Sequence, residues 1–167
     1  MSIETDITVR GGAWDDSADL QTLADKIVAQ VFAHLKMPDV TSELSVLLTD
    51  DAEIQEINAQ WRGQDKPTNV LSFPAVQMAV GAKPGVMLGD IIIAYETLAR
   101  EAAIENKSFH DHFTHLFVHG LLHLLGYDHE NDDDAALMEK QETDILQTLG
   151  VDDPYAADTH LSEVEDS

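Results

Sequence analysis

The chain of 167 residues is 44% hydrophobic, which fits one folded domain with a single core. It has no cysteine, which excludes disulfides, cysteine–zinc sites and thiol catalysis and suits a cytoplasmic protein. No apolar run approaches the ~18 residues of a membrane span, and the net charge of −23 argues against polyanion binding by an evenly charged surface, so we expect neither a membrane nor a DNA partner.

Apolar periodicity and turn-forming residues divide the chain into strands and helices that intermingle without regular alternation. In chain order they predict a strand (3–9), a helix (17–35), a strand (44–48), a helix (51–61), a loop (62–69), a strand (70–73), a connection (75–88), a strand (91–93) and three helices (96–104, 109–125 and 132–149). We interpret Trp61 as a core residue at the end of its helix.

These elements predict an α+β fold in a single domain, with a mixed sheet of about four strands and about five helices. The helix over 109–125 is apolar on most sides, so we expect it to be central and buried, although it bears histidines. Residues 1–150 are predicted to form this single domain, and residues 151–167 an acidic, disordered tail.

Three histidines at the end of the central helix have the spacing of a metal site. His119 and His123 are four residues apart, so they lie on one helix face and can bind the same ion. Gly126 would end the helix in a left-handed turn, after which His129 can offer a third nitrogen. Three imidazoles with an open fourth position are typical of catalytic zinc, so we predict one zinc ion per chain.

Four other residues near this pattern are interpreted differently. His112 and His115 continue the same helix stripe, and we interpret both as hydrogen-bonded core residues. Asp128 either orients a ligand imidazole or serves as a turn residue. Gly120 stands where zinc proteases carry their catalytic glutamate, so peptide hydrolysis by that mechanism is not expected.

Arg62 is the candidate residue for gripping a phosphate, because a guanidinium is always charged and donates two parallel hydrogen bonds. Lys66 in the same predicted loop could bind substrate beside it. Each has an alternative role as a surface cation. The 15 acids and one base of residues 108–167 contrast with residues 62–107, where five bases balance five acids. A nucleic acid would therefore approach this middle region.

Three segments together resemble the YbeY family. They are H-G-L-L-H-L-L-G-Y-D-H at 119–129, R-G-Q-D-K-P-T-N-V-L-S-F-P at 62–74 and G-D-I-I at 89–92. The resemblance implies a metal-dependent endoribonuclease acting on single-stranded RNA. Its expected role is maturation of the 3′ end of small-subunit ribosomal RNA and ribosome quality control.

By position, the resemblance assigns His119, His123 and His129 as zinc ligands and Arg62 as the essential arginine of the cleft. Because both ends of the chain are acidic, a ribosomal protein is an expected partner in targeting. Two alternatives remain: a non-catalytic ribosome-assembly factor with structural zinc, and a metallohydrolase of another substrate. A fourth protein ligand would favour the assembly factor, and His115 is the nearest candidate.

Overall fold

One four-stranded sheet organises the computed structural model, which describes residues 2–15 and 17–154. Its strands are β1 (Ser2–Val9), β2 (Thr41–Thr49), β3 (Val70–Pro74) and β4 (Met87–Ala94). They lie in the order β1-β2-β4-β3; β1, β2 and β4 are parallel, and β3 pairs antiparallel with β4. The predicted mixed sheet of four strands is therefore confirmed.

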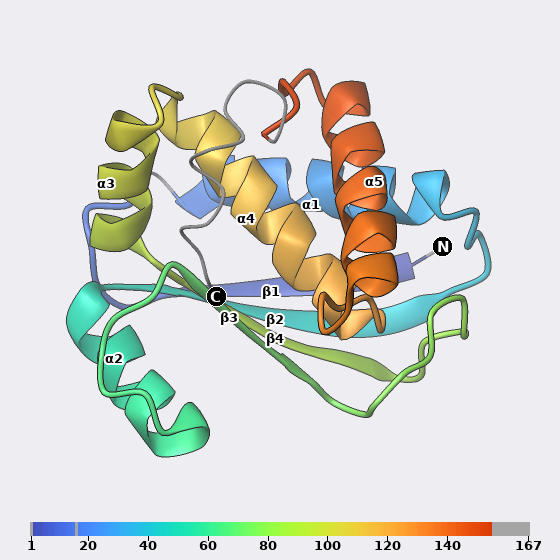
Figure 1. Ribbon diagram of the computed structural model, residues 1–167, viewed down its shortest axis with the longest axis horizontal. Helices are drawn as coiled ribbons and strands as arrows, with labels where there is room; N and C mark the ends of the chain where they lie inside the picture. Colours follow the sequence, from blue (N-terminus) through green and yellow to red (C-terminus); the bar gives the residue numbers. More distant parts are fainter. Residues whose placement is uncertain (1, 16, 155–167) are drawn as a thin grey trace.

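Helices cover the two faces of this sheet unequally (Figure 1). One face carries α1 (Ser17–His34), α3 (Tyr95–Ile104), α4 (Phe109–Leu124) and α5 (Asp132–Thr148), whereas α2 (Asp51–Arg62) lies on the other. The larger apolar core joins α1, α4 and α5 to the sheet, and a smaller cluster joins α2 to β3 and β4. Within the described residues, no helix has the length and apolar character needed to cross a membrane.

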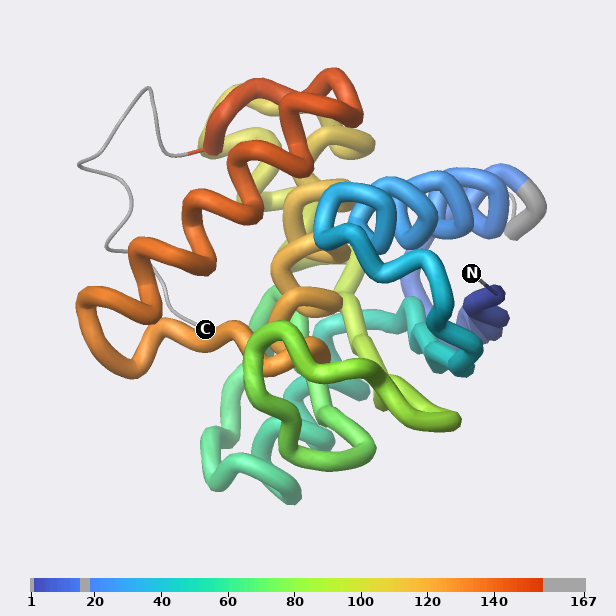
Figure 2. The backbone as a smooth tube through the Cα atoms, turned by 90° about the vertical axis from the view of Figure 1, so that its right-hand side faces the viewer, coloured from blue at the N-terminus to red at the C-terminus, as the bar shows by residue number. Residues whose placement is uncertain are grey.

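The helix α4 lies at the centre of the larger layer, between α1 and α5 (Figure 2). Its apolar residues are buried on several sides, as predicted, because α1, α3, α5 and the sheet all pack against it. Ser108 caps its start by accepting the backbone N–H of Asp111. Gly120 faces β4 so closely that a Cβ atom there would lie 3.3 Å from Cγ2 of Ile91.

The end of α2 differs from the prediction in two respects. Trp61 is 67% exposed rather than part of the core. Its ring contacts Phe73 with centroids 6.5 Å apart, but α2 covers only part of its sheet face, so most of the indole stays open. Arg62 is the last residue of α2 rather than the first of the loop, since the helix continues until Gly63.

The C-terminal boundary is only partly described. Val151 is buried in the larger core, and its backbone N–H donates to the carbonyl of Leu146 at 2.9 Å. Residues 155–167 lie outside the described residues, so disorder in the predicted tail remains untested.

Candidate metal centre

The three predicted ligands meet at one point. His119 and His123 extend from the last turns of α4, and His129 comes from the segment before α5. One nitrogen from each ring can be chosen so that all three lie within 4.8 Å of one another. The Nε2 atoms of His119 and His123 are 3.2 Å apart, so both rings direct the same nitrogen toward the centre of the cluster.

A tight turn returns His129 to the helix end. Gly126 has φ +101°, a conformation that side-chain-bearing residues rarely adopt, and its N–H donates to the carbonyl of His123 at 3.1 Å. A Cβ atom at this position would also lie 2.5 Å from the carbonyl oxygen of Met78. Both the backbone angle and the contact with the 75–86 segment therefore require glycine.

A buried carboxylate from α5 completes the surroundings of the cluster. Glu142 is 0% exposed, and its Oε2 hydrogen-bonds Nδ1 of His119 while Oε1 lies 3.3 Å from Nε2 of His115. The sequence prediction did not include Glu142. It lies on the buried face of α5 with Met138, Ile145 and Leu146, and an acid in such an apolar stripe was the signal that could have identified it.

The protonation states of this region favour metal binding. Burial, followed by the neighbouring imidazoles of His119 and His129, lowers the pKa of His123 to about 4. Its ring is therefore neutral near pH 7, as a metal ligand must be. Burial alone would raise the pKa of Glu142, but hydrogen bonds from His115 and His119 outweigh it and hold that pKa well below its usual range.

The other histidines of the stripe have protein partners, as predicted. His112 is 2% exposed, and its Nε2 lies 2.8 Å from Oε1 of Glu101. His115 bonds Glu142 and does not belong to the group of possible ligands. Asp128 accepts the backbone N–H of Glu130 at 3.3 Å, which is the turn role of its two predicted alternatives.

Gly120 occupies the position at which zinc proteases carry their catalytic glutamate. The residue is buried against Ile91 of β4, and a Cβ atom alone would already be a tight contact. A side chain at this position would require Ile91 to shift slightly. Because the residue is glycine, the general base of those proteases is absent from this site.

Within the described residues, neither Arg62 nor Lys66 forms a hydrogen bond or ion pair with the histidine cluster. Both are exposed, and neither side chain forms a hydrogen bond or ion pair within the part of the chain that the structure describes. The loop that carries Lys66 is held to α2 by Asn58, whose side chain donates to the carbonyl of Lys66 at 2.9 Å. Their roles at the substrate remain predictions.

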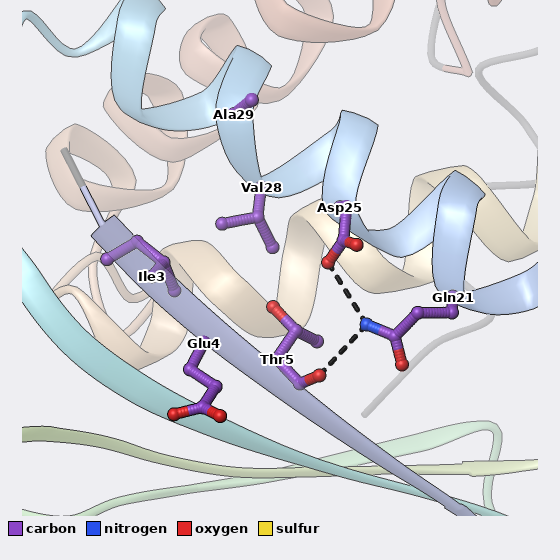
Figure 3. Close-up of a pocket in the computed structure, with 7 residues that line it drawn as sticks. All are labelled: Ile3, Glu4, Thr5, Gln21, Asp25, Val28 and Ala29. Atoms are coloured by element: carbon purple, nitrogen blue, oxygen red, sulfur yellow. Dashed lines mark hydrogen bonds between the residues drawn. The ribbon is translucent and has the colours of Figure 1, made fainter.

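Two hollows lie elsewhere on the protein. One, of about 260 Å³, lies between β1 and α1, where Gln21 donates to the carbonyl of Thr5 at 2.9 Å and to Asp25 at 3.1 Å (Figure 3). The other, of about 520 Å³, lies on the face covered by α2 and is bordered by Trp61 and Phe73. Neither includes a residue of the histidine cluster.

The fold and the cluster define a small α+β protein whose three histidines can hold a metal ion. The model of the family described as endoribonuclease YbeY matches residues 9–150. The chain belongs to the endoribonuclease YbeY family.

Two relatives named endoribonuclease YbeY match nearly all of the chain. The one from Bartonella henselae is 53% identical over 154 residues, covering 92% of this chain and 98% of its own. The one from Sinorhizobium fredii is 51% identical over 170 residues, covering 98% of each. The solution structure of TM1509 from Thermotoga maritima shares the fold, with a TM-score of 0.58 at 23% identity over 99% of this chain and 97% of that one.

Replacing any one of His119, His123 or His129 by alanine should abolish high-affinity binding of a divalent metal, because each removes one of three nitrogens that must act together. Metal content after dialysis against a weak chelator measures this. His110→Ala is the matched control, since that ring is exposed on the same helix, and should retain the metal. Full metal retention in all three cluster variants would contradict the assignment.

Proposed function

We propose that this protein is a zinc-dependent, single-strand-specific endoribonuclease. Its proposed substrate is ribosomal RNA in the cytoplasm, where it matures the 3′ end of the small-subunit RNA and takes part in ribosome quality control. The observation that carries the proposal is the convergence of three histidine nitrogens within 4.8 Å, in a chain that belongs to an endoribonuclease family. Three imidazole nitrogen donors that leave a position open suit zinc in a catalytic role.

The metal ion and four side chains have separate proposed roles in cleavage, with Lys66 binding substrate beside them. When bound, the ion supplies Lewis acidity toward the phosphodiester group. His119, His123 and His129 hold that ion, while Arg62 is proposed to grip a phosphate of the RNA and to stabilise the charge that builds during cleavage. Lys66 is proposed to bind a neighbouring phosphate. The exposure of both cations at the end of α2 and in its loop leaves them accessible to substrate.

The two alternatives find less support. A structural zinc in an assembly factor would use four protein ligands. Among the described residues, the possible ligand group contains only His119, His123 and His129, and His115 is not part of it. A peptidase of the zinc-protease type would need a glutamate where Gly120 packs against Ile91.

Charge supports the proposal that a ribosomal protein helps to target the enzyme. Residues 1–61 carry 12 acids and three bases, and residues 108–167 carry 15 acids and one base. Long-range attraction to RNA is therefore confined to residues 62–107, where the charges balance. A ribosomal partner would supply the affinity that so few phosphate contacts cannot.

The proposed function is tested by reconstitution of the purified protein. Apo protein should leave single-stranded ribosomal RNA intact, and protein loaded with about one zinc ion per chain should cleave it, because the ion supplies the Lewis acid. Double-stranded RNA is the matched substrate control and should remain uncut. Cells lacking the protein should accumulate small-subunit RNA with unprocessed 3′ ends. Normal ends in such cells, or equal cleavage by the apo form, would contradict the proposal.

Arg62→Ala should separate substrate binding from metal binding. The exposed side chain has no described partner, so the melting temperature and the zinc content should stay close to those of the wild type, as for surface substitutions that cost within about ±0.5 kcal/mol. RNA cleavage should fall by roughly a hundredfold or more, as when one charge-stabilising donor is lost. Arg62→Lys should recover only part of the rate.

The control for Arg62→Ala is Arg100→Ala, which removes an exposed arginine from the same near-neutral region and should keep most activity. Cleavage by Arg62→Ala at the wild-type rate would show that Arg62 is only a surface cation. A large drop in its melting temperature would show that Arg62 supports the fold instead.

A further inference from the structure

Glu142 is an unusual residue for the interior of this protein. It occupies the apolar stripe of α5 between Met138 and Ile145 and is 0% exposed, although an ionised carboxylate is costly to bury unless it is paired and hydrogen-bonded. Its two oxygens have separate partners on α4: Oε1 meets His115 and Oε2 meets His119. Two imidazoles one helical turn apart thereby hold the carboxylate in one orientation.

The contact with His119 determines which ring nitrogen is free. A carboxylate can only accept a hydrogen bond, so it selects the form of His119 that carries its proton on Nδ1. The lone pair then lies on Nε2, which is the nitrogen that faces Nε2 of His123 at 3.2 Å. Without this partner, the proton could move to Nε2, or the ring could turn about its χ2 angle, and either change would remove the lone pair from the cluster.

From this geometry we propose that Glu142 is the positioning residue of the metal centre. It fixes the tautomer and the ring plane of His119, so that α5 contributes to the site. His115 orients the carboxylate of Glu142 and does not bind the ion. Such outer partners of metal-binding histidines hold the rings in place and raise their basicity as ligands. The inference rests on the proposed function in taking the occupant of the three-histidine cluster to be zinc.

A second carboxylate–imidazole pair, between Glu101 of α3 and His112 of α4, supplies the matched control. Glu101 Oε1 lies 2.8 Å from Nε2 of His112, a ring that is buried two turns before His119 and is not among the possible ligands. Losing either pair should destabilise the protein through an unpaired buried group. Only the loss of the Glu142 pair should change the affinity for metal.

The test compares Glu142→Gln, Glu142→Leu and Glu101→Gln in the full-length protein, with zinc affinity measured by competition with a coloured chelator and folding by the melting temperature of the apo forms. Glu142→Leu should bind zinc about tenfold to a hundredfold more weakly, in the range seen when such outer partners are lost. Glu142→Gln should lose less, since its amide oxygen can still accept from Nδ1. Glu101→Gln should melt earlier than the wild type yet bind zinc with unchanged affinity.

Nitrogen-15 spectra of the apo protein show which ring nitrogen of His119 carries the proton. This position would not change if Glu142 served only to stabilise the fold. His119, assigned by comparison with His119→Ala, should carry its proton on Nδ1 in the wild type and populate both forms in Glu142→Gln. This readout decides the matter if Glu142→Leu fails to fold. Wild-type zinc affinity in folded Glu142 variants, or an Nε2 proton on His119 in the wild type, would overturn the inference. Failure of the wild type to bind zinc would instead overturn the zinc assignment of the proposed function.

Discussion

Four imidazoles lie along one stripe of a helix that is otherwise buried among apolar side chains, and each of them must find a partner there. Glu101 is hydrogen-bonded to His112, and Glu142 is hydrogen-bonded to both His115 and His119. The nitrogens of His119 and His123 that face each other, together with His129, are left for an ion. Because the three rings come together only in the folded chain, metal binding is expected to be coupled to folding.

Two glycines allow close contacts between the α4 region and its surroundings. Gly120 lets α4 approach Ile91 of β4, and Gly126 lets the following turn pass beneath the carbonyl of Met78. The turn at Gly126 returns His129 to the other two histidines. Because position 120 is glycine, no glutamate acts from there, and Arg62 is our candidate for the catalytic group outside the cluster.

Local patterns in the sequence predicted the structural features that depend on residues close together along the chain. The helical spacing of His119 and His123 and the glycine turn before His129 predicted the cluster, and apolar periodicity predicted every helix and strand approximately. Glu142 was missed because its partners lie on another helix, and the strand order was not predicted because pairing joins distant segments. Trp61 was wrongly placed in the core because periodicity does not show how much of a sheet face a helix covers.

We infer that His119, His123 and His129 hold one ion and leave a coordination position open. Zinc K-edge X-ray absorption of the zinc-loaded protein tests it most directly, since the outer-shell scattering of imidazole rings identifies the ligands. We predict three imidazole nitrogens at about 2.0–2.1 Å and one further light ligand that exchanges with solvent. A spectrum with fewer than three imidazoles, or with a fourth protein ligand closing the site, would contradict the account.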